Sequence, residues 1–410
     1  MELRVMAVPT LDDGSFEDRT VGLRVDINSP VDDQGNLTDD SRFHAHLDSI
    51  EELLEYGASI VLLAHQGRPG QQDFTSLEGH AVHLSSLLSH DVAFVDAVFS
   101  GDARRAIGSL APGDILCLEN LRFASEELLS LDSTNPDQTH LVNRLSDELD
   151  CYVNDAFAVS HRSQPSIVGF PDRLPSFAGR LLAREKAILG DLPSTPKPRI
   201  AILAGAKVDD SLVILERLLR EQLVDRVLVG GIVANVLFVA IGRNPGESTE
   251  LDLEARDSIS AIDYASTLYD QFGDRIVLPE DVVIPTDDGR AVIAVDDFPI
   301  EGVAPRDIGP QTIDHWRAII DESSTVICNG PLGRFEDERF TDGTEEVFRA
   351  VSTVECSIAG GGDTSAAIER FGIDGFSHVS TGGGASLTLL SGKSLPGIEA
   401  LTACNFELQH

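Results

Sequence analysis

The chain has 410 residues, 42% of them hydrophobic, and its 68 acidic against 31 basic side chains give a formal net charge of −37. The length favours two globular domains with separate cores, and the apolar content excludes a disordered chain. The acidic excess excludes nucleic-acid binding through a basic face. We interpret it as adaptation to a salt-rich cytoplasm, because molar salt shortens the screening length to ~3 Å and suppresses self-repulsion. An ordinary acidic protein is the alternative interpretation.

Two further observations concern location. No stretch approaches 18 uninterrupted apolar residues, and the first residues lack a basic segment followed by an apolar one. We therefore predict neither a membrane span nor an export signal. The 5 cysteines are scattered and include no C-x-x-C pair, which argues against a disulfide framework or a zinc site and favours a cytoplasmic protein.

Short apolar runs alternate with helical patterns through the first half of the chain. Strands are predicted over 21–27, 59–64, 92–95, 114–118 and 151–154, and helices over 42–56, 77–90, 102–110 and 138–149. This alternation is typical of βαβ units and predicts an α/β fold with a mainly parallel sheet.

The second half repeats the alternation after a helix predicted over 176–192, which is followed by Pro193 and Pro196. We place the domain boundary at this helix. Further strands are predicted over 199–204, 226–229, 275–278, 325–328, 356–359 and 377–380. Further helices are predicted over 210–221, 232–241, 252–272, 311–321, 342–351, 364–371 and 384–391.

Polar and basic residues follow the strands of the first half, where ligands of parallel sheets usually bind. The arginines in question are Arg42, Arg68, Arg122 and Arg162, accompanied by His65 and His161. Guanidinium groups suit bidentate contact with phosphate and carboxylate, so this half predicts a small, highly anionic substrate. Each arginine could instead pair with one of the many acids. Asp26 is either a turn residue or an acceptor for a substrate hydroxyl.

Glycines follow the strands of the second half. They occur at Gly205, at Gly230–Gly231, in the run from Asn329 to Glu336, at Gly360–Gly362 and at Gly382–Gly384. Glycine turns that open helices present backbone N–H groups to anions, so we predict a phosphate site. It is not a P-loop, because Leu387 stands where the first glycine is required, and no G-x-G-x-x-G occurs. Asp363 suits either Mg²⁺ binding or a helix cap.

The motifs RVDINSP, DDSR, HQGRP, ENLRF, YVNDAF with HR, GAKVDD, NGPLGRFE, AGGGDTSAA and HVSTGGGASLTLL occur in this order from about residue 20 to about residue 400. The series resembles the phosphoglycerate kinase family. The resemblance implies two Rossmann-like lobes with mainly parallel sheets around a central cleft, joined by a hinge helix. The implied domains are a phosphoglycerate-binding lobe over 1–176, the helix over 177–192 and a nucleotide-binding lobe over 193–391, with 392–410 packing back on the first lobe.

The resemblance also implies the reaction and its residues. The reaction is reversible in-line phosphoryl transfer between 1,3-bisphosphoglycerate and ADP in glycolysis and gluconeogenesis, with Mg²⁺, lobe closure and a monomeric enzyme. The implied substrate contacts are Asp26, Asn28, Arg42, His65, Gln66, Gly67, Arg68, Arg122 and Arg162. The implied nucleotide contacts are Lys207, Glu336, Gly361, Gly362, Asp363 and Thr364, with Asp363 on the metal. Arg42, Lys207, Gly362 and Gly382 are the implied catalytic residues.

The sequence departs from the family pattern at a few positions. Ser211 stands where many members have a second lysine, which leaves open which cation meets the transferring group. Gln66, Gln164 and Gln311 also replace commoner residues. A catalytically silent nucleotide- or phosphate-binding protein on the same fold is the alternative function, although Arg42, Lys207 and Asp363 are all present. A dehydrogenase is disfavoured by the missing glycine motif.

Overall fold

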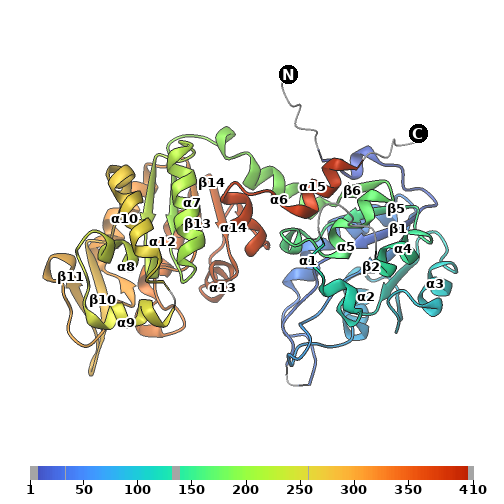
Figure 1. The fold of residues 1–410 in the computed structure, drawn as a ribbon, viewed down its shortest axis with the longest axis horizontal. Coiled ribbons are helices and arrows are strands. Elements are labelled where there is room, and N and C mark those ends of the chain that lie inside the picture. Colours follow the sequence, from blue (N-terminus) through green and yellow to red (C-terminus); the bar gives the residue numbers. More distant parts are fainter. Residues whose placement is uncertain (1–7, 33, 132–138, 257, 405–410) are drawn as a thin grey trace. The chain divides into compact units, whose positions relative to one another are not determined.

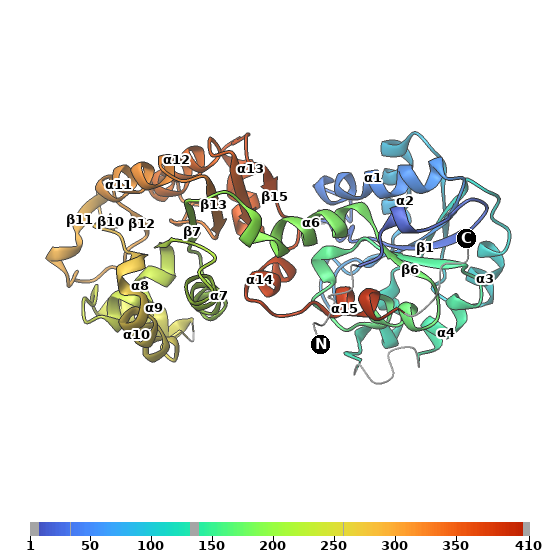
Figure 2. The ribbon, with the colours of Figure 1, turned by 90° about the horizontal axis from the view of Figure 1, so that it is seen from above.

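The computed structural model describes residues 8–32, 34–131, 139–256 and 258–404. The chain forms two compact units, Met1–Ala187 together with Ser394–His410, and Ile188–Lys393. Each unit is built on a six-stranded sheet with helices packed against it (Figure 1, Figure 2). None of the helices in these ranges combines the length and apolar content that a membrane span needs.

The sheet of the first unit has the strand order β3-β4-β2-β1-β5-β6, and all neighbouring pairs are parallel. Its strands are β1 (Thr20–Arg24), β2 (Ser59–Leu63), β3 (Val92–Val95), β4 (Ile115–Leu118), β5 (Cys151–Asn154) and β6 (Ser176–Ala178). Its helices are α1 (Ser41–Glu55), α2 (Glu78–Leu88), α3 (Gly101–Ile107), α4 (His140–Ser146), α5 (Pro165–Val168) and α15 (Pro396–Ala403). Helix α6 (Arg180–Gly190) begins in this unit, and the junction between the units falls within it.

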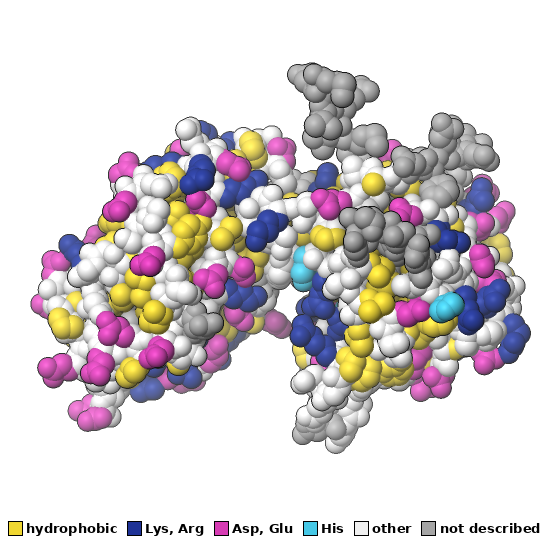
Figure 3. All heavy atoms as spheres, in the orientation of Figure 1, with side chains coloured by type: hydrophobic (Ala, Val, Ile, Leu, Met, Phe, Trp, Pro, Cys, Tyr) yellow, Lys and Arg dark blue, Asp and Glu magenta, His cyan; other side chains and the backbone are white. Residues whose placement is uncertain are grey.

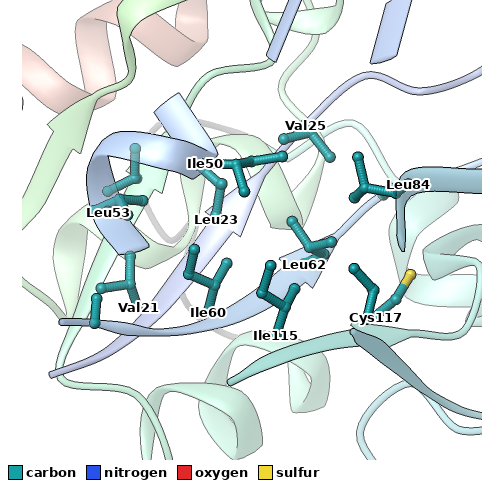
Figure 4. Close-up of a cluster of buried hydrophobic side chains, with 14 of the residues drawn as sticks. Val21, Leu23, Val25, Ile50, Leu53, Ile60, Leu62, Leu84, Ile115 and Cys117 are labelled. Atoms are coloured by element: carbon teal, nitrogen blue, oxygen red, sulfur yellow. The ribbon is translucent and has the colours of Figure 1, made fainter. Parts of the chain in front are cut away.

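The core of the first unit follows from the two-residue period of its strands. Alternate residues of β1, β2 and β4 turn one apolar face toward α1, whose Ile50 and Leu53 lie over them (Figure 4). All of these side chains are buried. The apolar stripe of α1 therefore fixes that helix against the sheet, and its polar residues are left for other contacts.

The second unit contains a parallel sheet of order β15-β14-β13-β7-β8-β9 and a separate antiparallel sheet of order β11-β10-β12. Its strands are β7 (Arg199–Leu203), β8 (Arg226–Val229), β9 (Ile276–Val277), β10 (Asp281–Thr286), β11 (Gly289–Ala294), β12 (Asp307–Ile308), β13 (Thr325–Asn329), β14 (Cys356–Gly360) and β15 (His378–Val379). Its helices are α7 (Val208–Arg220), α8 (Gly231–Ala240), α9 (Glu247–Ala255), α10 (Ala261–Phe272), α11 (Pro310–Asp321), α12 (Asp342–Val351), α13 (Gly362–Arg370) and α14 (Gly384–Leu390).

The predicted α/β alternation with mainly parallel sheets is confirmed, and the predicted strands are present to within a few residues at their ends. The helix predicted over 138–149 corresponds to α4, with residue 138 lying outside the described residues. Two helix predictions are wrong in part. Residues 176–178 form β6 instead of the first turn of a helix, and the single helix predicted over 252–272 is the pair α9 and α10.

Each error has a physical reason. The backbone of β6 pairs with β5, so an edge position in the sheet overrides local helix propensity. The second helix is divided near Ser258 and Ser260, residue types whose side chains compete for backbone hydrogen bonds and favour turns and caps. The sheet formed by β10, β11 and β12 had no counterpart in the prediction, because its strands neither follow a βαβ rhythm nor join by helices.

Candidate active site

The carboxyl ends of β4, β2, β1 and β5 lie side by side in the first unit, since these strands are neighbours in the sheet. The predicted substrate residues follow those strands or, for Arg42, open α1. Acidic side chains are scattered over the visible surface of both units, and one of several groups of Lys and Arg side chains lies on the first unit (Figure 3). This edge therefore concentrates positive charge in a chain that is otherwise strongly acidic.

Asp26 and Arg42 form the first pair of this site. Arg42 Nη1 lies 2.5 Å from Asp26 Oδ2, and the arginine side chain is 35% exposed while the aspartate side chain is 5% exposed. Burial raises the pKa of Asp26, but the charges of Arg42, His65 and Arg24 outweigh burial and hold that pKa below its ordinary value. Asp26 is thus a carboxylate, able to accept a hydrogen bond from a ligand hydroxyl.

The remaining basic groups lie close enough to perturb one another. Burial and the nearby charges of Arg24, Arg122 and Arg162 hold the pKa of His65 well below its ordinary value. Burial, Arg162 and Arg24 lower the pKa of Arg122 to about 10, and burial together with Arg68 lowers the pKa of Arg162. Burial is the largest cause of each depression, and repulsion between neighbouring positive charges adds to it. A polyanionic ligand would relieve that repulsion, which is the chemistry expected of a phosphate and carboxylate site.

Hydrogen bonds join the loops that carry these groups. Asn28 Oδ1 accepts the N–H of Gly67 at 2.8 Å, and Arg122 Nη1 donates to the carbonyl of Gly67. Gln66 accepts the N–H of Ser29 at 3.0 Å and donates to the Ser29 carbonyl at 2.9 Å. The side chain of Gln66 is buried, so its amide is committed to holding the two loops together. Arg68 is exposed, and Arg162 is partly buried.

The glycine turns of the second unit likewise meet at one edge, because β14, β13, β7 and β8 are neighbours in its sheet. A side chain at Gly330 would collide with the carbonyl of Ala204, and a Cβ at Gly231 would lie 2.9 Å from the backbone nitrogen of Gly205. Only glycine permits backbones to approach this closely, and Gly330 also has a φ of 90°. The Gly330 N–H donates to Thr364 Oγ1 at 2.8 Å, which ties this turn to α13.

A pocket of about 580 Å³ opens beside these turns, wholly within the second unit. Its lining combines glycine backbone and apolar side chains such as Phe238 with charged side chains such as Arg306 and Arg334. The predicted residues Glu336 and Asp363 both line it, and both are exposed. A pocket that joins apolar walls to several charged groups suits a small ligand that has both an apolar and a polar part.

Other predicted residues of the second unit lie outside that lining. Lys207 is exposed at the N-cap of α7, and Gly361 and Gly362 lead into α13, with a φ of 99° at Gly361. Thr364 is buried and accepts the Gly330 N–H. The N–H of Gly382 donates to Ser380 Oγ at 3.1 Å, so this donor already has a partner.

Within the described ranges, no group of three or more His, Cys, Asp and Glu side chains is arranged to hold a metal ion. A site built from protein ligands alone is thus not apparent there. Asp363, exposed in the first turn of α13, is a hard oxygen donor that fits Mg²⁺ brought in with a nucleotide, since Mg²⁺ is usually bound by one or two carboxylates plus phosphate oxygens.

The family model described as phosphoglycerate kinase matches residues 11–393. The chain belongs to the phosphoglycerate kinase family. It is 46% identical to a phosphoglycerate kinase of Natronomonas pharaonis over 96% of this chain and 99% of that one. It is 47% identical to one of Halobacterium salinarum over 97% and 100%. The crystal structure of the Pyrococcus horikoshii phosphoglycerate kinase has a TM-score of 0.89 at 39% identity and covers 96% of this chain and 98% of that one.

Three buried residues of the first unit, Arg24, His46 and Asp155, were not among the predicted site residues, although they contact the loops that carry them. Arg24 is fully buried, and its Nη2 lies 3.1 Å from His65 Nδ1, while its Nε donates to Ser166 Oγ at 2.9 Å. Arg24 therefore holds the His65 ring in place through a buried contact. The sequence signal that could have identified Arg24 was a charged residue in the otherwise apolar strand β1, since charged side chains are seldom buried without a partner. Nothing in the sequence alone indicated that His46 and Asp155 meet.

Proposed function

We propose that this chain catalyses reversible phosphoryl transfer between 1,3-bisphosphoglycerate and ADP, giving 3-phosphoglycerate and ATP. The observation that carries the proposal is the cluster of Arg42, His65, Arg122 and Arg162 around Asp26 in a chain of the phosphoglycerate kinase family. The cluster offers charge for a carboxylate and phosphates, and Asp26 offers an acceptor for the hydroxyl between them.

We assign the phosphoglycerate to the first unit and the nucleotide to the pocket of the second. The lobe over 1–176 and the lobe over 193–391, with α6 between them, are the corresponding functional parts. Glu336 would accept from the ribose, and the turn from Gly361 to Thr364 would lie along the phosphates. Mg²⁺ bound with the nucleotide would neutralise phosphate charge, with Asp363 as its protein ligand.

The proposed chemistry is direct in-line transfer without a covalent enzyme intermediate. The transferring group spreads negative charge over its equatorial oxygens, so the protein contributes mainly positioning and charge stabilisation. Arg42 and Lys207 supply side-chain cations, and the turn at Gly362 supplies backbone N–H donors, with Gly382 a further donor if its N–H leaves Ser380. Transfer requires the ligands of both units to come together with water excluded, because an acyl phosphate hydrolyses readily.

Ser211 bears on which cation acts. Its side chain is buried, and among the described residues its Oγ has no hydrogen-bond partner. It therefore offers no substitute for the lysine that many family members have at this position. Among side chains, we therefore assign the positive charge that faces the transferring phosphoryl group to Lys207 and Arg42.

Arg42→Ala tests the proposal in a coupled assay with MgATP and 3-phosphoglycerate in molar KCl. Wild type should form 1,3-bisphosphoglycerate, and the variant should lose ~10²-fold or more in rate, the usual cost of removing one transition-state charge partner. Arg184→Ala is the matched control, because Arg184 pairs with Asp48 at an exposed position of the same unit. A folded wild type that binds nucleotide without transferring phosphate would establish the silent binding protein instead.

We further propose that the protein works as a monomer in a salt-rich cytoplasm. The net charge of −37 supports the salt adaptation, because it opposes both self-association and folding at low ionic strength. Of the free cysteines, Cys117, Cys151 and Cys328 are buried, as suits a reducing compartment.

A further inference from the structure

Helix α1 carries a line of polar side chains that begins at the substrate site. Residues 42, 46, 49 and 52 are spaced by three or four positions, so they share one face of the helix. At one end Arg42 pairs with Asp26. At the other end Ser49 Oγ accepts the N–H of Arg180 at 2.8 Å, and Glu52 accepts from the Arg180 guanidinium. Arg180 is the first residue of α6, so one face of α1 reaches from Asp26 to the start of α6.

His46 lies in the middle of this line, and its two ring nitrogens have different partners. The backbone N–H of Asp26 donates to His46 Nε2 at 2.9 Å. A nitrogen that accepts a hydrogen bond carries no proton, so the ring proton is on Nδ1, which lies 2.7 Å from Asp155 Oδ2. The side chains of His46 and Asp155 are 2% and 0% exposed, so water cannot replace either bond. One tautomer of His46 thus fixes the Asp26 backbone and the Asp155 carboxylate together.

The other oxygen of Asp155 caps α6. Asp155 Oδ1 accepts the N–H of Leu181 at 2.9 Å and that of Leu182 at 3.3 Å, which satisfies donors that a helix start leaves unpaired. Gly179 allows the approach, because a side chain there would collide with this carboxylate. The carboxylate also faces the positive end of the helix dipole. Asp155 is therefore held between His46 on one side and α6 on the other.

We propose that His46 and Asp155 are positioning residues that hold Asp26 and the first turn of α6 in one continuous set of hydrogen bonds. Occupation of the site at Asp26 and Arg42 by 3-phosphoglycerate then steadies the start of α6, the helix in which the two units join. The inference rests on the proposed function only for the identity of the ligand. The hydrogen bonds themselves all lie within the first unit.

Two substitutions divide the two roles of His46. The amide nitrogen of asparagine can stand where Nδ1 stands, so His46→Asn keeps a donor to Asp155 and leaves the Asp26 N–H without an acceptor. The amide oxygen of glutamine can reach the place of Nε2, so His46→Gln keeps the acceptor for Asp26 and deprives Asp155 of its donor. A residue that served only to fill space would not distinguish these variants.

The experiment measures KM for 3-phosphoglycerate, KM for MgATP, and hydrogen–deuterium exchange of the segment containing Leu181 and Leu182, with and without 3-phosphoglycerate. In wild type, 3-phosphoglycerate should slow that exchange. His46→Asn should raise KM for 3-phosphoglycerate on the order of tenfold, the consequence of one unpaired buried donor, with KM for MgATP unchanged. His46→Gln should keep KM for 3-phosphoglycerate within about twofold of wild type but abolish the ligand's effect on exchange.

Asp48→Ala is the matched control on α1, because Asp48 forms an exposed pair with Arg184 of α6 and lies off the polar line. It should change neither KM nor the effect of the ligand on exchange. The proposed set of hydrogen bonds would be overturned if His46→Asn and His46→Gln had the same KM for 3-phosphoglycerate and the same exchange. It would also be overturned if 3-phosphoglycerate still slowed exchange at Leu181 and Leu182 in His46→Gln. Exchange is read without turnover, so a failure of phosphoryl transfer in wild type would refute the proposed function, remove the KM comparison and leave the exchange comparison between wild type and His46→Gln as the test of this inference.

Discussion

At the scale of single residues, burial sets the charge of Asp307 at the start of β12. Asp307 is 4% exposed, and its oxygens accept the N–H groups of Ile308 and Gly343, each at 2.9 Å. Burial nevertheless outweighs these bonds and raises the pKa of Asp307 from 3.8 to about 8. The folded chain therefore retains a proton on Asp307 at a pH where the unfolded chain has released it.

This retained proton predicts a pH dependence of stability. Between pH 3.8 and about pH 8, the folded state binds more protons at Asp307 than the unfolded state does, so the free energy of unfolding falls as the pH rises. The contribution is at most ~1.4 kcal/mol per pH unit. Asp307→Asn cannot titrate, so wild type should lose stability relative to the variant from pH 5 to pH 8. Urea unfolding of both proteins in molar KCl measures the difference, and parallel pH profiles would refute the assignment.

At the scale of elements, one hydroxyl joins β13 to α13. The Gly330 N–H lies in a turn that only glycine can form, and Thr364 Oγ1 is its acceptor at 2.8 Å. Thr364 is fully buried, so water cannot take over if the hydroxyl is removed. The turn after β13 leads to Glu336, and α13 carries Asp363, so this bond holds two predicted parts of the nucleotide site in register.

We expect Thr364→Val to raise KM for MgATP on the order of tenfold and to lower the free energy of unfolding by about 1–3 kcal/mol, because a buried donor loses its acceptor. KM for 3-phosphoglycerate should not change. Thr364→Ser keeps the hydroxyl and is the matched control, expected to behave like wild type in both measurements. Steady-state kinetics and urea unfolding give the two quantities, and a valine variant with normal KM for MgATP would contradict the assigned role.

At the scale of the whole molecule, charge governs stability. A net charge of −37 repels itself when salt is removed, and the Debye length grows from ~3 Å at 1 M to ~30 Å at 0.01 M. The ion pairs at the surface do not offset this repulsion, because each exposed pair contributes only ~0–1 kcal/mol to the free energy of unfolding. Folding of this chain should therefore depend on salt.

We expect the far-UV circular dichroism of the protein to show loss of helix as KCl is lowered from molar concentration to near zero, and recovery when salt is restored. Replacing KCl by an equal concentration of sucrose is the control, since sucrose favours compact states without screening charge. A fold that is unchanged across the salt range would disprove the adaptation that we infer from composition.

The sequence by itself determined the family and the strands of the two parallel sheets except β6. It also led to the predicted site residues, because βαβ units place functional residues at fixed offsets after strands. Asp26, His65 and Arg122 could be found in this way. Contacts between distant positions could not. The meeting of His46 with Asp155, 109 residues apart, the burial of Arg24 and the engagement of Gln66 with Ser29 depend on how β1, β2 and β5 pair. Pairing with β5 likewise made a strand of residues 176–178, where local propensity favoured a helix. Only the tertiary structure decides such features, because neighbours in a sheet are chosen by packing of the whole core and not by residues close in sequence.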